Sequence, residues 1–292
     1  GLWLRADSDF RRGTFGTKVV NDTTDLFGLI GDVKGDGFQV QPWVTVGLVG
    51  QDSPKFGVEN GLPGNATAWW AGISGELTMF DPFRFAFDAG YSTLDTDYSA
   101  LDRSGWLLGL SMSYKTAWGV PTLKFWYTSG DDGNVKNGSE RPLITGDFNT
   151  GASVFFGSQN LAGNMASDCG ATYTGTWGLS AQWNKASFIE GLFHNFRVTY
   201  IQGTNSKKMA QYLKSTPNDL GRYLTTKDSV IDVSFDSVYS IYKNLAAMLE
   251  LSYAFENMDG KLWGKAMGID GGNGKAHFSD AWRINMKFMY TF

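Results

Sequence analysis

Few residues in this chain have the types and the spacing that catalysis requires. The 292 residues include two histidines and one cysteine. His194 begins a predicted strand, and His277 falls in a predicted loop near Asp270 and Asp280. A lipid hydrolase would need one of these histidines beside a serine nucleophile, and a protease would need one beside paired carboxylates. We find no such signature in the sequence. Cys169 alone builds neither a disulfide framework nor a metal site. We therefore expect no enzyme and no catalytic residues.

A second candidate site is a predicted loop rich in oxygen ligands. It contains Asp131, Asp132, Asn134, Asn137 and Glu140, with glycines between them. Hard oxygen ligands of this kind suit calcium, although their spacing matches no EF-hand. Polar residues and glycine are also the usual composition of turns. The loop could therefore bind calcium near Asp131 and Asp132 or could be a plain turn, and the sequence does not decide between the two. No other cofactor or metal is expected.

The remaining charged residues alternate with apolar ones. In the last segment, Trp282, Ile284, Met286, Phe288 and Tyr290 alternate with Arg283, Asn285, Lys287 and Met289. Such alternation predicts a strand with a different solvent on each face. The same pattern predicts twelve strands: one within 1–9, a hairpin over 27–48, four over 66–129, two over 172–202, two over 227–256, and the last. Pro42 and Pro121 interrupt this pattern, so we expect a bulge or a strand end at each.

These strands predict a transmembrane barrel. No run approaches the roughly 20 apolar residues that a spanning helix needs, so a chain that crosses a bilayer must do so as a closed sheet. Short turns are predicted near 35, 81, 118, 187 and 243, and longer loops at 10–23, 51–65, 95–103, 130–171, 203–226 and 257–277. In the last-but-one of these loops, Met209, Tyr212 and Leu213 have the spacing of a small helix. We predict one all-β antiparallel barrel domain over 1–292, with long extracellular loops and short periplasmic turns.

The outward aromatic residues support that topology. One group is predicted at the extracellular ends of the strands and another at the periplasmic ends, about 20 to 25 Å apart, which is the height of a barrel's apolar band. The first group is Trp69, Tyr91, Trp106, Tyr127, Tyr173, Tyr200, Tyr253 and Trp282. The second is Phe83, Tyr114, Trp183, Tyr239, Tyr290 and Phe292.

The opposite faces of the strands predict a water-filled pore. Its charged lining is expected to include Glu76, Arg84, Asp88, Lys115, Lys124, Arg197, Asp232, Asp236, Glu250, Arg283 and Lys287. Cations and anions occur in near-equal number, whereas strong ion selectivity needs a ring of one sign. We therefore predict passive, weakly selective diffusion of ions and small polar solutes. The alternative is an adhesin or receptor barrel that acts through its outer loops, the longest of which is 130–171.

Two motifs resemble known families. Phe292, with Tyr290 and Phe288 behind it, resembles the assembly signal of outer-membrane barrels, which implies recognition by the barrel insertion machinery. Residues 125–134 and the closing strand resemble the homotrimeric porins of sulfate-reducing bacteria. This resemblance implies a homotrimer, sixteen strands if N-terminal strands are missing from this chain, and a loop folded inward to narrow the pore, nearest to 10–23.

Composition narrows the partners. The net charge is −4, and no basic run carries interleaved aromatic residues, so nucleic acid is not expected. Outer-membrane lipid and lipopolysaccharide are the expected surroundings, in a Gram-negative bacterium. Gly1 has no charged or apolar leader ahead of it, so we expect that a secretion signal has already been removed.

Overall fold

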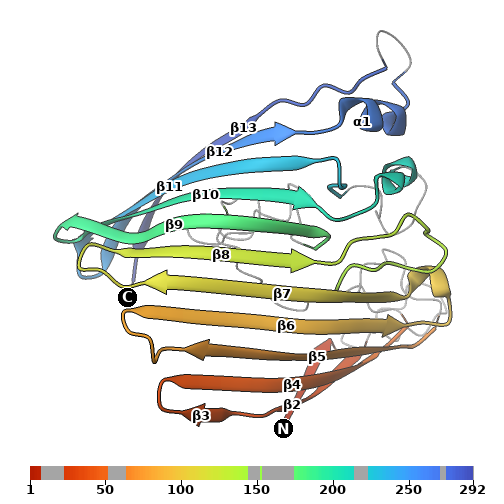
Figure 1. The fold of residues 1–292 in the computed structure, drawn as a ribbon, viewed down its shortest axis with the longest axis horizontal. Coiled ribbons are helices and arrows are strands. Elements are labelled where there is room, and N and C mark those ends of the chain that lie inside the picture. Colours follow the sequence, from red (N-terminus) through yellow and green to blue (C-terminus); the bar gives the residue numbers. More distant parts are fainter. Residues whose placement is uncertain are drawn as a thin grey trace.

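The computed structural model is one curved antiparallel sheet (Figure 1). It describes residues 1–7, 23–51, 64–143, 152, 174–213, 223–269 and 274–291. The strands are β1 Leu2–Asp7, β2 Thr24–Ile30, β3 Val33–Gly35, β4 Phe38–Val49, β5 Ala66–Leu77, β6 Phe83–Asp95, β7 Arg103–Tyr114, β8 Val120–Thr128, β9 Thr176–Ile189, β10 Leu192–Gly203, β11 Ser229–Tyr242, β12 Leu245–Asn257 and β13 Ala281–Tyr290.

Each strand pairs with its neighbour in the sequence. The order is β1-β2-β4-β5-β6-β7-β8-β9-β10-β11-β12-β13, and β3 pairs with β4 further along the line of β2. Because β2 and β3 are two parts of one predicted strand, the twelve predicted strands and their antiparallel order are confirmed. Within the described ranges no pairing joins β1 to β13, so the described sheet is a curved barrel wall whose outermost strands are β1 and β13.

Short turns lie at one end of the sheet and long connections at the other (Figure 1). Four of the five predicted turns are where the sequence places them. The turn predicted near 187 instead lies at Glu190 and Gly191, because β9 continues to Ile189. The pairing of β9 with β10 has two register shifts, each of which adds one residue to β9, and Lys185 at one of them has a positive φ of 54°. These added residues move the turn toward the C-terminus.

Both prolines are accommodated where pairing is interrupted. Pro42 lies inside β4, and its carbonyl accepts from the Gly31 amide. Because the N–H and C=O of one strand residue point to the same side, the missing N–H of Pro42 faces the gap between β2 and β3. The strand break is therefore on the neighbouring strand. Pro121 is the second residue of β8, just before the first β7–β8 partner pair, Ser113 and Thr122. The expected strand end is confirmed there.

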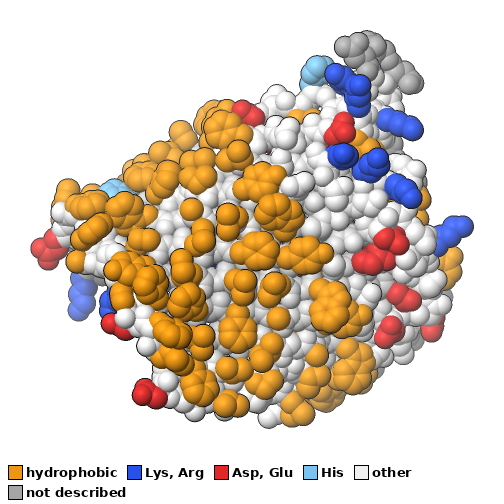
Figure 2. All heavy atoms as spheres, viewed as in Figure 1, with side chains coloured by type: hydrophobic (Ala, Val, Ile, Leu, Met, Phe, Trp, Pro, Cys, Tyr) orange, Lys and Arg blue, Asp and Glu red, His pale blue; other side chains and the backbone are white. Residues whose placement is uncertain are grey.

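The two faces of the sheet have opposite chemistry. Figure 2 shows hydrophobic side chains covering the convex face between the two ends, while charged side chains gather toward the ends. The exposed set includes Leu110, Ile73 and Trp106, of which Trp106 is 61% exposed. The concave face instead holds buried polar residues such as Ser180, Thr199 and Gln182. An apolar surface of this extent facing outward is typical of a membrane protein.

Aromatic side chains on the convex face form cross-strand pairs near both ends of the strands. Tyr91 and Trp106 have ring centroids 4.5 Å apart near the loop end. Phe83 and Tyr114 have ring centroids 4.8 Å apart near the turn end. These rows support the two predicted aromatic groups, of which Tyr173 and Phe292 lie outside the described residues.

In the described parts of the long connections there are three short helices: the 3-10 helices η3 Ser99–Leu101 and η6 Lys207–Tyr212, and α1 Gly260–Met267. Helix η6 confirms the predicted small helix, with Met209 and Ala210 buried. Helix α1 falls in a segment predicted as a loop. Asp259 caps its N-terminus by accepting from the Lys261 and Leu262 amides. None of the described helices is long and apolar enough to cross a membrane.

Candidate functional site

The predicted pore-lining residues that lie on strands share the concave side of the sheet, in two zones, and Lys115 lies just after β7 in the turn. Register places them opposite the exposed aromatic rows. Near the turns, Arg84 donates to the Glu76 carboxylate through Nε (3.0 Å) and Nη2. Asp88, Lys115 and Lys287 are exposed in the same zone. These side chains are therefore accessible to solvent on the concave side.

The second zone is a buried charged cluster on β10 to β13. Arg197 Nη2 lies 2.6 Å from Asp236 Oδ2, and both side chains are almost wholly buried. Asn285 donates to Glu250 Oε2 at 3.0 Å, and Arg283 Nε donates to Asn285 Oδ1 at 3.0 Å. Asp232 is buried on the same face and has further interactions, while Lys124 is half-buried. The structure therefore brings four predicted lining residues together: Arg197, Asp236, Glu250 and Arg283.

A segment that the sequence did not predict also occupies the concave side. It is residues 139–143, which we call the inward segment. Trp70 Nε1 on β5 donates to the Leu143 carbonyl at 2.7 Å, and the Leu143 amide donates to Ser92 Oγ on β6 at 2.7 Å. Leu143 packs in a buried cluster with Ala68 and Leu94. The chain that leaves β8 thus crosses back over β7 and β6 to β5, inside the wall.

Strand β7 has a glycine where the inward segment crosses it. A Cβ on Gly105 would lie 2.3 Å from Pro142 N and 2.6 Å from Glu140 O, so no larger residue fits unless the crossing chain moves. The crossing is fastened by backbone hydrogen bonds from Ser104 N to Ser139 O and from Ser139 N to Asp102 O, each 2.9 Å. The inward segment is therefore part of the wall's own hydrogen-bond pattern.

A buried ion pair anchors the inward segment. Arg141 Nε lies 3.1 Å from Asp131 Oδ2, with side chains 2% and 1% exposed. The Arg141 guanidinium carbon also lies 3.5 Å from the centroid of the Tyr223 ring. Asp131 Oδ1 accepts from Ser139 Oγ at 2.6 Å and from the Glu140 amide at 3.1 Å. All the interactions of the Asp131 carboxylate are thus directed at the segment that it holds.

Those contacts bear on the suggested calcium site. Asp132 accepts from the Asn134 amide at 2.7 Å, and Glu140 accepts from the Asp132 amide at 3.0 Å. Burial raises the pKa of the Glu140 carboxyl, as do the charges of Asp132 and Asp131. Within the described ranges no three His, Cys, Asp or Glu side chains are grouped to hold a metal. The loop is a hydrogen-bonded turn, and calcium there stays a prediction.

Two buried polar residues that the sequence analysis missed tie the loop bases together. Asn205 Nδ2 donates to the Gly175 and Leu224 carbonyls, and its Oδ1 accepts from the Asp131 amide at 2.9 Å. Asp228 accepts from Thr225 through Oδ2 and from Trp263 Nε1 through Oδ1. An asparagine or aspartate after a strand is a common loop residue, so local sequence gave no signal for either role.

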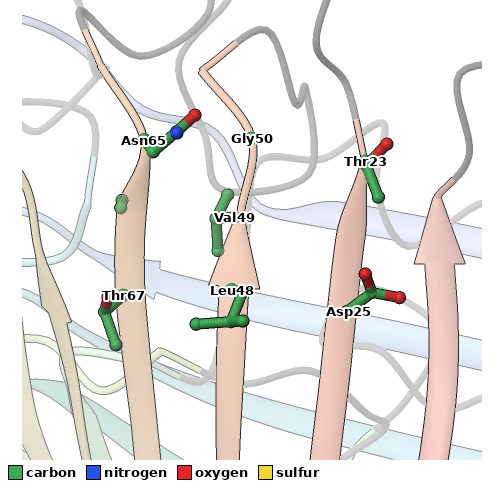
Figure 3. A pocket seen from close by; sticks show the side chains of 8 residues that line it. Thr23, Asp25, Leu48, Val49, Gly50, Asn65 and Thr67 are labelled. Atoms are coloured by element: carbon green, nitrogen blue, oxygen red, sulfur yellow. The ribbon is translucent and has the colours of Figure 1, made fainter.

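A shallow hollow on the other face marks the loop-end edge of the apolar band (Figure 3). It is lined by Thr23, Asp25, Leu48, Val49, Gly50, Asn65, Ala66 and Thr67 at the ends of β2, β4 and β5. Asp25, Leu48 and Thr67 are cross-strand neighbours on the convex face. They lie two residues closer to the loop end than Phe27 and Trp69. Asp25 and Thr67 place polar groups just beyond the aromatic row, as expected where an apolar band ends.

The two histidines are not brought together. His194 Nδ1 lies 2.8 Å from Ser237 Oγ, and the ring stacks on Phe235 at 5.2 Å on the convex face near the turns. His277 is exposed near the loops, where Asp280 accepts from the Tyr253 hydroxyl. Asp270 and Cys169 lie outside the described residues. Among the described residues, no carboxylate forms a hydrogen bond with His194. The expected lack of enzymatic activity stays a prediction.

Comparison with known proteins gave distant likenesses in structure. No family model and no curated protein matches the sequence. The crystal structure of Pseudomonas aeruginosa OccK11 (OpdR) aligns with a TM-score of 0.48 and 14% identity, over 93% of this chain and 59% of that chain. Pseudomonas aeruginosa OpdO gives 0.35 and 12%, over 94% and 70%, and LpxR from Salmonella typhimurium gives 0.30 and 9%, over 94% and 90%. At these scores we take no function from them. This chain spans about three fifths of the OccK11 chain.

Proposed function

We propose that this chain forms the wall of a water-filled channel in the outer membrane of a Gram-negative bacterium. The observation that carries the proposal is the contrast between the two faces: the convex face exposes large apolar side chains, and the concave face holds charged and polar ones. Unpaired strand edges are not stable in lipid, so we propose that the wall belongs to a closed barrel. Lipid and lipopolysaccharide would contact the convex face, and a homotrimer stays a proposal.

The same geometry supports weak selectivity and a narrowed lumen. Cationic Arg84, Lys115 and Lys287 share the turn-end zone with Glu76 and Asp88, so neither sign forms a ring. The inward segment supplies the constriction that the resemblance to porins implies. It comes from the connection between β8 and β9, whereas the predicted position, 10–23, lies almost wholly outside the described residues.

Reversal potentials test this function. The refolded protein in a planar bilayer, under a tenfold potassium chloride gradient, is expected to conduct with a reversal potential close to zero, since the lining carries both signs of charge. A protein with heat-modifiable gel migration that carries no current would contradict the channel and favour the receptor alternative. A reversal potential near the limit for one ion would contradict weak selectivity only.

The assembly signal gives a separate prediction. Phe288 and Tyr290 are exposed on the convex face of β13, and Phe292 lies outside the described residues. If the insertion machinery reads the terminal residue, Phe292→Ala will lower the amount in the outer membrane several-fold, while the purified variant refolds and conducts normally.

Phe196→Ala on β10 is the matched control, because it removes one ring that is exposed on the convex face and leaves Phe288, Tyr290 and Phe292 unchanged. Its cellular yield should follow its refolding yield. Normal abundance of Phe292→Ala in cells, or equal failure in cells and in detergent, would leave only an interfacial aromatic role for Phe292.

A further inference from the structure

Two adjacent rows of side chains cross the concave face of the last four strands. One row contains Asn195, Asp236, Glu250 and Asn285 on β10, β11, β12 and β13. The next contains Arg197, Ser234, Ser252 and Arg283 on the same strands. Asp236 and Glu250 are direct cross-strand partners, which places their Cβ atoms about 5 Å apart. Two carboxylates so placed repel each other unless a positive group lies between them.

Four buried oxygens of this cluster have no hydrogen bond: Asp236 Oδ1, Asp236 Oδ2, Glu250 Oε1 and Ser252 Oγ. Asp236 Oδ2 lies 2.6 Å from Arg197 Nη2, so three of the four have neither a hydrogen bond nor a salt bridge. Their residues are 1%, 0% and 6% exposed, so the oxygens are buried as well as unpartnered. Unpaired buried acceptors, and charged ones above all, are costly enough to be rare in folded proteins. Such a group calls for a donor that the wall itself does not provide.

The neighbouring cations do not supply that donor. Arg197 Nη2 lies 2.6 Å from Asp236 Oδ2, outside hydrogen-bond geometry, and Arg197 Nη1 lies 3.4 Å from Ser234 Oγ. Arg283 donates through Nε to Asn285. Glu250 accepts only from the neutral Asn285 amide, and no described residue forms an ion pair with it. The cluster therefore contains one carboxylate, Glu250, that has no salt bridge of its own, and Arg197 and Arg283 act on its charge only from a longer distance.

The number and kind of free acceptors match a primary ammonium group. An ammonium carries three N–H donors, one positive charge and no acceptor. Three acceptors are available here, and one negative charge is uncompensated by an ion pair. A divalent metal fits less well, because calcium takes six to eight oxygen ligands and the cluster offers two carboxylates beside a guanidinium.

We infer that Asp236, Glu250 and Ser252 bind the primary ammonium group of a small solute on the concave face. The charged hydrogen bonds fix the ammonium, and Arg197 holds Asp236 in place. This inference rests on the proposed channel only for how the solute arrives. The binding itself can be measured whether or not the protein conducts.

The test uses methylammonium with the refolded full chain in detergent micelles. Saturation-transfer NMR is expected to show methylammonium bound to the unaltered protein and competed by excess ethylammonium. Tetramethylammonium has the same charge but no N–H donor, so it should give no transfer and no competition. Glu250→Gln is expected to weaken methylammonium binding about tenfold, since a hydrogen bond to a charged acceptor is lost. Ser252→Ala should weaken it less.

Glu190→Gln is the matched control, because it removes one carboxylate from the exposed β9–β10 turn and should leave binding unchanged. Heat-modifiable migration confirms that each variant is folded. Equal binding of tetramethylammonium, displacement of methylammonium by calcium at a lower concentration than by ethylammonium, or unchanged binding in folded Glu250→Gln would each overturn the site. Current in a planar bilayer is recorded separately, so a protein that binds but does not conduct contradicts the channel alone.

Discussion

Arg141→Ala is expected to lower the free energy of unfolding by about 3 to 5 kcal/mol, the usual cost of removing one partner from a buried ion pair. The substitution leaves the Asp131 carboxylate buried, with the Ser139 hydroxyl and the Glu140 backbone amide as its remaining hydrogen-bond donors. It also removes the contact of the guanidinium with Tyr223. Urea denaturation of the protein in detergent, followed by tryptophan fluorescence, measures the loss.

The same substitution should change the channel. Without Arg141 the inward segment loses its ion pair and keeps only neutral donors to Asp131, its backbone bonds and the contacts of Leu143. We therefore expect it to leave the concave side more often. Single-channel conductance is expected to rise and to fluctuate more. Lys136→Ala, an exposed position in the same connection, should alter neither quantity. A destabilised variant with unchanged conductance would show that the inward segment does not narrow the pore.

Ile73→Arg is expected to destabilise the protein by about 2 to 4 kcal/mol, the cost of an arginine at the lipid-facing midplane of a barrel. Ile73 is exposed on the convex face of β5, four residues from Trp69, which marks the loop end of the apolar band. An arginine there cannot reach water easily from the middle of the band. Unfolding in urea after refolding into lipid vesicles measures the effect.

Ser74→Arg is the matched control on the next residue. Ser74 faces the concave side, directly opposite Asp88, so an added arginine meets water and a carboxylate. Among the described side-chain contacts, the substitution removes one hydrogen bond, which Trp43 Nε1 donates to Ser74 Oγ at 3.3 Å. We expect a change below about 1 kcal/mol, within the usual range for exposed charge pairs. Equal destabilisation by the two substitutions would mean that the convex face is not the lipid face.

The sequence alone determined the strands and their faces, since both depend on a local pattern with a period of two. In β13, Phe288 and Lys287 could be assigned to opposite faces before any pairing was known, because neighbouring side chains of a strand point in opposite directions. Short turns then fix the pairing of consecutive strands, which is why the order from β1 to β13 followed. A local irregularity such as that at Lys185 has no periodic signal, and the turn after β9 was misplaced for that reason.

Only the tertiary structure decided what lies inside the wall. Trp70 and Leu143 are 73 residues apart in the chain, and Asp131 and Asn205 are 74 apart. Contacts at such separation depend on where a long connection closes, and nothing in the composition of 130–171 distinguishes a loop that turns inward from one that projects outward. The Asp236–Glu250 pair is of the same kind. Each carboxylate was predicted to face the pore, but only the register of β11 against β12 places them side by side, where Asp236 Oδ1 and Glu250 Oε1 have no hydrogen-bond donor.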